Sequence, residues 1–255
     1  MNKRIVVKVG SNVLTHDNRK LNVTRMSALV DQIAWLRSRG YEVILVSSGA
    51  VACGRQELKV AHELDSVEQR QLFSALGQTK LIGLYYDLFR EYNIHVGQVL
   101  TMKENFEPGE QYDNQRACMR VMLENVVLPI VNENDTVSVT ELMIPENDEL
   151  SGLIAQMLEA DVLILLSNID GIYDGAPDNP SSQLIRTVRS GEDLSAYIQT
   201  SKSTFGRGGM SSKYATAKRV AATGIQVIIA NGTRDDILIN LMERSSETPH
   251  TTFQP

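Results

Sequence analysis

Apolar residues along the chain follow two alternating patterns, one typical of buried strands and one typical of amphipathic helices. Short runs rich in Val, Ile and Leu predict strands at residues 4–11, 43–46, 94–100, 127–131, 161–166 and 225–229. Apolar residues at helical spacing predict helices at residues 22–40, 66–92, 112–125, 146–159 and 214–223, with a last helix from Asp235. We also expect a hairpin at residues 136–144, a short acidic helix at residues 191–199 and an edge strand at residues 250–253.

This alternation predicts an α/β fold, a three-layer αβα sandwich with a mainly parallel central sheet. The length permits one large domain or two small ones, and we favour a single domain over residues 1–255. The long helix at residues 66–92 contains Gly77 and Gly83, which we expect to loosen it midway. Its length suggests a surface that could serve a homo-oligomer. Ligands of such a fold bind at the carboxyl ends of the strands.

Composition narrows the class of protein. With 42% hydrophobic and 22% charged residues, the chain resembles an ordinary soluble protein, and no apolar run approaches the ~20 residues of a membrane helix. Lys8 interrupts the first apolar run after three residues, which favours a cytoplasmic enzyme over a secreted one. A net charge of −6 disfavours nucleic acid as a partner. Cys53 and Cys118 are too few for a disulfide framework, so each is expected to pack as a small hydrophobe.

Residues 205–213 place three glycines, two serines and Lys213 directly before a predicted helix. Glycines let backbone N–H groups approach an anion, and the helix N-terminus and the lysine add positive charge, so the stretch suits a phosphate group. It is not a Walker A loop, because the chain contains no Gly-Lys pair. A Gly/Ser surface loop without a ligand is the alternative interpretation.

Polar side chains occur within or just after several predicted strands. Lys8 lies inside the first strand, where burial is costly without a task; the alternative is an edge-strand lysine that points to solvent. Residues 47–50 form a small-residue turn after the second strand, either a ligand site or a simple tight turn. Residues 132–136 follow a further strand, and Asp148 opens a helix, so these groups either bind a ligand or cap the next element. Residues 167–173 form another polar turn after a strand. We expect all of them near one edge of one sheet.

As a set, these motifs resemble the amino-acid kinase family along nearly the whole chain. The matching stretches are 7–11 (Val-Lys-Val-Gly-Ser), 46–50 (Val-Ser-Ser-Gly-Ala), 95–98 (His-Val-Gly-Gln), 132–135 (Asn-Glu-Asn-Asp), 147–148 (Asn-Asp) and 208–213 (Gly-Gly-Met-Ser-Ser-Lys). The resemblance is to members that phosphorylate glutamate, and it implies ATP-dependent transfer to the glutamate side-chain carboxylate, the first step of proline biosynthesis. It also implies a short form without the C-terminal domain, similar to modules of RNA-modifying enzymes, that many bacterial members carry.

The resemblance implies a role for each matching residue. Lys8 and Lys213 would flank the transferred phosphoryl group, and Asp148 would orient both lysines. The implied substrate-binding residues are Ser48, Gly49, Asn134, Asp135 and Asn147. The implied nucleotide-binding residues are Lys8, Gly10, Ser167, Asn168, Arg207, Gly208, Gly209, Met210, Ser211, Ser212 and Lys213. The N-terminal part would thus bind the amino acid, and the part from about residue 160 the nucleotide.

The resemblance also implies partners. These are L-glutamate, ATP with Mg²⁺ held mainly by the ATP phosphates, proline as a feedback inhibitor, and functional coupling to glutamyl phosphate reductase; neither nucleic acid nor a membrane is implied. Family members often have Thr-Asp where Ser167-Asn168 stands, so this chain lacks a carboxylate at that position.

The chemistry supports this interpretation independently. A side-chain carboxylate, with a reference pKa of ~4.3, is ionised at neutral pH and needs no general base, so we assign no catalysis to any of the four histidines. Two lysines, a helix N-terminus and Mg²⁺ can offset the charge of an anion attacking a polyanion. The alternatives are another family member, acting on acetylglutamate, carbamate or uridylate, and a non-catalytic amino-acid sensor on the same fold.

Overall fold

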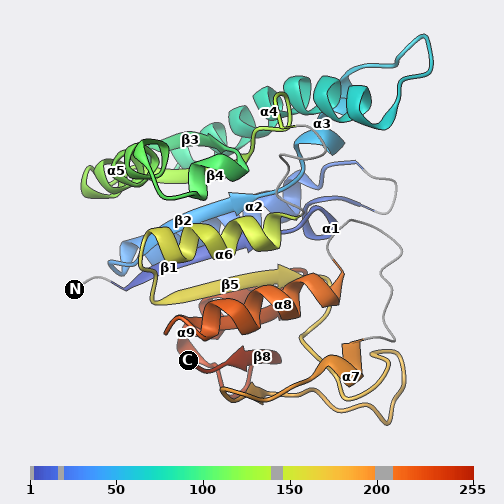
Figure 1. The fold of residues 1–255 in the computed structure, drawn as a ribbon, viewed down its shortest axis with the longest axis vertical. Coiled ribbons are helices and arrows are strands. Elements are labelled where there is room, and N and C mark those ends of the chain that lie inside the picture. The colour runs from blue at the N-terminus through green and yellow to red at the C-terminus, as the bar shows by residue number, and fades with distance from the viewer. Residues whose placement is uncertain (1–2, 17–19, 139–145, 199–208) are drawn as a thin grey trace.

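The computed structural model describes residues 3–16, 20–138, 146–198 and 209–255. Within these residues, eight strands form one sheet in the order β3-β4-β2-β1-β5-β7-β8-β6 (Figure 1). The strands are β1 Arg4–Val9, β2 Glu42–Ser47, β3 Val96–Thr101, β4 Leu128–Glu133, β5 Val162–Ser167, β6 Thr187–Val188, β7 Gln226–Asn231 and β8 His250–Phe253. The six predicted core strands are therefore all present.

The sheet is parallel from β3 to β7 and changes direction only at β8. β1 pairs in parallel with β2 on one side and β5 on the other, so the strand that carries Lys8 is central. This rules out the alternative of an edge-strand lysine. The strand predicted at residues 250–253 is present as β8, but it is not an edge strand, because it runs antiparallel to β7 and also pairs with β6. The sequence pattern missed β6, which has only two residues.

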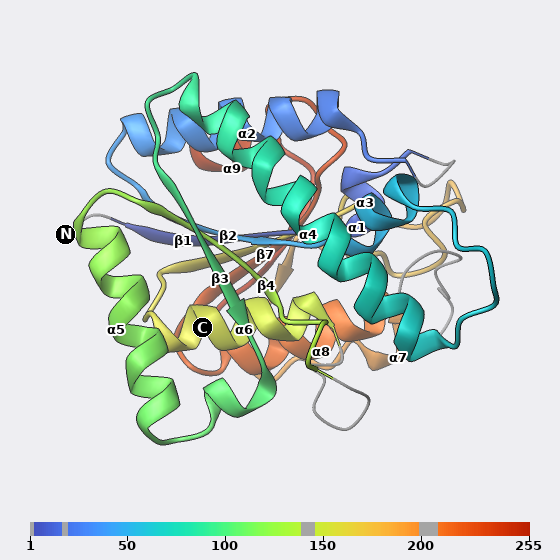
Figure 2. The same ribbon diagram turned by 90° about the horizontal axis from the view of Figure 1, so that it is seen from above.

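Helices cover both faces of the sheet, which confirms the predicted three-layer sandwich. Figure 2 shows α2, α4 and α9 on one side and α5, α6 and α8 on the other. The helices are α1 Ser11–Leu14, α2 Val23–Ser38, α3 Ala50–Glu57, α4 Ser66–Arg90, the 3-10 helix η1 Lys103–Phe106, α5 Glu110–Glu124, α6 Asn147–Met157, α7 Ser195–Ile198, α8 Met210–Ala221 and α9 Ile237–Glu243. Among them, none combines the length and apolar character needed to cross a bilayer.

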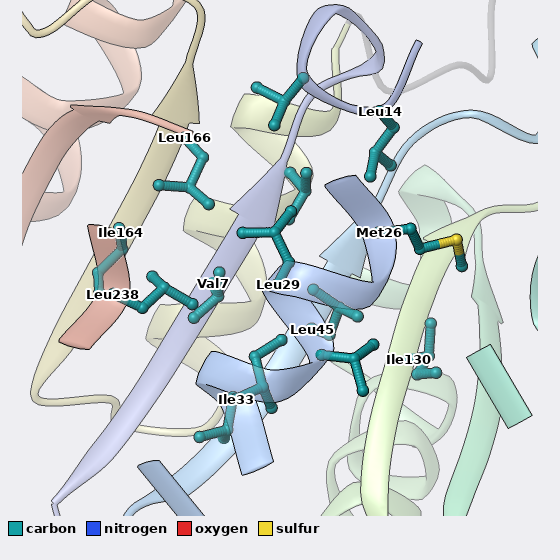
Figure 3. Packing of buried hydrophobic residues seen from close by; sticks show 14 of the residues in the cluster. Val7, Leu14, Met26, Leu29, Ile33, Leu45, Ile130, Ile164, Leu166 and Leu238 are labelled. Carbon is teal, nitrogen blue, oxygen red and sulfur yellow. The ribbon is translucent and has the colours of Figure 1, made fainter. Parts of the chain in front are cut away.

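Two hydrophobic clusters, one on each face, fix which way the side chains of β1 point. Val7 belongs to the cluster with α2 and α9, where it lies among residues such as Leu29 and Leu238 (Figure 3). Val6 belongs to the opposite cluster, which α6 and α8 complete. Because side chains alternate along a strand, Lys8 points to the same side as Val6. The lysine therefore faces the helices that carry Asp148 and Lys213.

The α3–α4 pair packs closely through two glycines. A Cβ at Gly77 would lie 1.7 Å from the backbone oxygen of Ala50, and one at Gly54 would lie 1.9 Å from that of Phe73. Gly77 therefore brings α4 against the start of α3, a packing role that the sequence pattern did not predict. A Cβ at Gly83, by contrast, would meet nothing within 4 Å.

The helix predicted from residue 214 begins at Met210, so part of the predicted glycine-rich loop is the first turn of α8. Cys53 is buried as expected, but Cys118 is exposed on α5 and does not pack as a core residue. Residues 139–144 of the predicted hairpin lie outside the described residues.

Candidate active site

Two lysines from distant parts of the chain meet on one buried carboxylate. Lys8 Nζ of β1 lies 2.7 Å from Asp148 Oδ1, and Lys213 Nζ of α8 lies 2.9 Å from Asp148 Oδ2. The side chain of Lys8 is only 5% exposed, that of Lys213 is 7% exposed, and that of Asp148 is 0% exposed. Asp148 sits in the first turn of α6 and Lys213 in the first turn of α8. We call these three residues the lysine–aspartate triad.

The triad has strongly coupled charges. Burial lowers the pKa of Lys8, against the attraction of Asp148, and the neighbouring charge of Lys213 lowers it further. Burial alone would raise the pKa of Asp148, but the charges of Lys8 and Lys213 and their hydrogen bonds outweigh burial and lower it. Asp148 is therefore an anion at neutral pH. With both lysines protonated, the triad carries a net charge of two minus one, or +1, in a site suited to an anion.

Gly10 and Glu146 complete the surroundings of the triad. A Cβ at Gly10 would lie 3.3 Å from Lys8 Nζ, so a glycine leaves room beside the ammonium group. Glu146 precedes α6 and hydrogen-bonds with Ser212 of α8. Burial raises the pKa of Glu146 and the charge of Asp148 acts in the same direction, while Ser212 opposes them. This contact connects the starts of the two helices that supply Asp148 and Lys213.

A chain of four polar side chains borders the triad on the β2–β4 side. Asn147 Nδ2 donates to Ser48 Oγ at 2.8 Å and to Asn132 Oδ1 at 3.0 Å. Asn132 Nδ2 in turn donates to Gln78 Oε1 of α4 at 3.0 Å. Gly49 lies in the turn after β2 and is the N-cap of α3. Its φ of 109° is in the left-handed region, which favours glycine. The predicted residues Ser48, Gly49 and Asn147 thus come together.

Asp135 lies in a second polar cluster after β4. Arg70 of α4 donates through Nε to Asp135 Oδ1 and through Nη2 to Glu133 Oε2, both at 2.5 Å. Ser138 also donates to Glu133, at 2.9 Å. Asp135 and Glu133 are nearly buried, so the guanidinium holds two carboxylates at the end of β4.

Asn134 has a local role in this loop. Its Oδ1 accepts from Thr136 Oγ1 at 2.6 Å, while its backbone oxygen accepts from the backbone N–H of Ser138. Asn132, two residues earlier, is the amide that contacts Asn147. Substrate binding by Asn134 stays a prediction.

The other described residues of the predicted nucleotide site lie at the end of β5 and at the start of α8. Ser167 is buried at the end of β5, and Asn168 after it is exposed. Gly209 is the N-cap of α8, whereas the Met210 side chain is buried in the cluster beneath it. The first turn of α8 also contains Ser211, which is exposed, and Ser212. Arg207 and Gly208 lie outside the described residues.

An ion pair that the sequence pattern did not predict connects the loops after β5 and β7. Arg234 Nε and Nη2 donate to the two oxygens of Asp170 at 2.6 and 2.7 Å, and Asn231 Nδ2 donates to Asp170 at 3.1 Å. These hydrogen bonds lower the pKa of Asp170. The pair therefore fastens the two loops that border the predicted nucleotide side.

Sequence reasoning missed four polar residues of the site: Arg70, Gln78, Asn132 as a contact of Asn147, and Arg234. Asn132 stood in the recognised stretch 132–135, and its position directly at the strand end was the available signal. Arg70 and Gln78 are spaced eight residues apart on one helix, which predicts a shared face but no function.

Comparisons with known proteins identify the family of the chain. A model of the amino acid kinase family matches residues 3–231. The chain is 62% identical over 252 residues to a Bacteroides thetaiotaomicron protein named glutamate 5-kinase, covering 99% of this chain and 70% of that protein. It is 46% identical over 237 residues to a protein of the same name from Chlorobaculum tepidum, covering 92% of this chain and 65% of that protein.

A solved structure from another organism has a similar fold. Carbamate kinase from Giardia lamblia bound to AMP-PNP has a TM-score of 0.71 at 16% identity, covering 99% of this chain and 98% of the other. At that identity the likeness concerns the fold alone. With the family model matching most of its length, the chain belongs to the amino acid kinase family.

Proposed function

We propose that the protein transfers the γ-phosphoryl group of ATP to the side-chain carboxylate of glutamate, forming glutamyl 5-phosphate and ADP, the first step of proline biosynthesis. The observation that carries this proposal is the buried lysine–aspartate triad next to the Ser48–Asn147 pair, which combines a surplus positive charge with polar groups for an amino acid. The 62% identity to a protein named glutamate 5-kinase supports glutamate as the acceptor.

In the proposed reaction, a carboxylate oxygen of glutamate attacks the γ-phosphorus of ATP. A new O–P bond forms while the bond to the β-phosphate oxygen breaks, and ADP leaves with the electron pair of that bond. The attacking carboxylate is already ionised at neutral pH, so no side chain has to remove a proton. Lys8 and Lys213 offset the charge on the transferred group, and Asp148 acts as a positioning residue that holds both ammonium groups in place.

We assign to the remaining groups the roles that the family resemblance implies. Asp135 binds the amino group of glutamate, and Ser48, Gly49 and Asn147 bind its carboxylate oxygens, with Asn134 beside them. The nucleotide lies against Gly10, Ser167, Asn168 and residues 207–213. The N-terminus of α8 adds donors and positive partial charge for the phosphates.

We propose that Mg²⁺ arrives bound to the phosphates of the nucleotide. Among the described residues, no group of three or more His, Cys, Asp and Glu side chains could hold a metal ion by itself. Asp148 is fully buried and forms ion pairs with two lysines. Bound to the ATP phosphates, Mg²⁺ would neutralise part of their charge.

The proposal extends to regulation and cellular context. We propose that proline inhibits by competing at or beside the glutamate site, that the product passes to glutamyl phosphate reductase, and that the enzyme is a cytoplasmic homo-oligomer. Proline should then raise the glutamate concentration needed for half-maximal rate. A rate at low glutamate that proline leaves unchanged would remove the regulatory proposal alone.

The test of the function is a coupled ADP-release assay with glutamate, followed by trapping of the acyl phosphate with hydroxylamine. Glutamyl hydroxamate should form only with ATP and glutamate together. Acetylglutamate, carbamate and UMP serve as rival acceptors, and preference for one of them would replace glutamate in the proposal. A protein that binds glutamate but releases no ADP would instead be an amino-acid sensor, an outcome that the two buried lysines argue against.

A further inference from the structure

We propose that Gln78 of α4 is a positioning residue that sets the direction of the hydrogen-bond chain ending at the Ser48 hydroxyl. The chain passes from Gln78 through Asn132 and Asn147 to Ser48 and joins α4, β4, α6 and the turn after β2. The inference rests on the proposed function, because it concerns how the same site presents a donor to a carboxylate of glutamate.

The direction of the chain decides what Ser48 can offer a substrate. Asn132 Nδ2 donates to Gln78 Oε1, and Asn147 Nδ2 donates both to Asn132 Oδ1 and to Ser48 Oγ. Because Ser48 accepts from Asn147, its own hydrogen is left to donate. Within the described residues, no protein group accepts that hydrogen. A carboxylate oxygen is the natural acceptor for it, since hydrogen bonds to charged groups are stronger than neutral ones.

A chain of amides can run in either of two directions, because each amide has an acceptor oxygen and a donor nitrogen. In the reverse direction, Gln78 would donate to Asn132, Asn132 to Asn147, and Ser48 would spend its hydrogen on Asn147 Oδ1. The substrate would then lose its hydroxyl donor. Gln78 Oε1 supplies the acceptor for Asn132 Nδ2 at the far end of the chain, and this acceptor favours the observed direction over the reverse one.

Burial makes this end group effective. Asn132 is only 3% exposed, so it must satisfy its donor and acceptor within the protein, and an unpaired buried amide is costly. Gln78 is only partly buried, yet its place is fixed by the residue before it. Gly77 packs so closely on Ala50 that a Cβ would lie 1.7 Å from the Ala50 oxygen. α4 thus cannot shift along α3 without breaking this contact, and Gln78 Oε1 stays within reach of Asn132.

The test compares Gln78→Met with a matched control, Gln69→Met, in the hydroxamate assay. Gln69 lies on the same helix but takes no part in the chain, because its Nε2 donates to the backbone oxygen of Leu64 and its Oε1 accepts from Arg55 Nη2. We expect Gln78→Met to raise the KM for glutamate about tenfold, the ratio typical of a lost hydrogen bond at a charged group, with kcat and the KM for ATP little changed. Gln69→Met should leave the KM for glutamate unchanged. Gln78→Ala replaces the methionine variant if the latter melts more than about 5 °C below wild type.

A double-mutant cycle with Ser48→Ala tests whether Gln78 acts through Ser48. If it does, adding Gln78→Met to Ser48→Ala should change the KM for glutamate by less than about twofold, because the hydroxyl that Gln78 orients is already gone. A full tenfold effect in both backgrounds, or an unchanged KM in the single variant, would overturn the inference while the proposed function stands. A wild-type protein that forms no hydroxamate would overturn the proposed function, and this inference with it.

Discussion

Replacing Asp148 by Asn should strongly destabilise the ligand-free protein, because it leaves two buried ammonium groups without a carboxylate. The net charge of the triad would rise from +1 to +2 in a site where the three side chains are 0 to 7% exposed. At an effective dielectric constant of about 20, Nζ–Oδ distances of 2.7 and 2.9 Å correspond to about 6 kcal/mol of attraction each, most of it offset by desolvation. Breaking a buried pair typically costs about 3 to 5 kcal/mol. For a chain of this size, that lowers Tm by about 10 °C.

Calorimetry of the ligand-free protein measures this effect, with Glu149→Gln as the control. Glu149 is the next residue on α6, and its half-exposed ion pair with Arg219, at 3.3 Å, should contribute less than about 1 kcal/mol. Adding Lys213→Met to Asp148→Asn returns the net charge to +1, so the double variant should regain stability but not turnover. If Asp148→Asn melts within 2 °C of Glu149→Gln, the argument from buried charge is wrong.

Four further predictions concern single groups. Lys213→Met should lower kcat on the order of a hundredfold to a thousandfold, with little change in Tm because Asp148 keeps its ion pair with Lys8. A kcat above about a third of wild type would contradict the catalytic role of Lys213. Asp135→Ala should weaken glutamate binding about thirtyfold or more while ATP binding stays unchanged, measured by calorimetric titration of each ligand. Gly77→Ala should destabilise by about 1 to 3 kcal/mol in urea unfolding, whereas Gly83→Ala on the same helix should stabilise by about 0.5 to 1 kcal/mol. Because burial lowers the pKa of Lys8, kcat should begin to fall at a pH below 10.5, the usual lysine pKa. The free energy of unfolding should rise with pH over the same range, since Lys8 of the unfolded chain keeps its proton to a higher pH. A kcat that is flat up to pH 10.5 would contradict this.

The strands and the polar groups at their ends could be predicted from the sequence because both depend on local pattern. A continuous apolar run such as residues 162–166 has one stable place, inside a sheet covered on both faces. Lys8 stood out because it interrupts such a run. The pattern also placed Asp148 at a helix start, but only the fold shows that β1, α6 and α8 bring it between two lysines.

The parts that escaped prediction depend on contacts between distant segments. Gln78 and Arg70 look like ordinary polar residues of an amphipathic helix until α4 is placed over the end of β4. Gly77 looks like a weak point of a helix, because a sequence does not reveal that another backbone approaches it. The start of α8 was placed late because glycine and serine residues predict a loop, whereas Met210 already packs in the core.

The central place of β1 has a consequence for how the protein is made. β1 ends at Val9, yet one of its two neighbours, β5, begins only at residue 162. At about 5 to 20 residues per second, translation reaches β5 on the order of 10 s later. During that interval, β1 can pair with β2, but its other edge exposes unpaired backbone groups next to Ile5 and Val7. The nascent chain therefore presents an open, apolar strand edge that a chaperone could shield, and catalytic competence arises only after Lys213 has been synthesised.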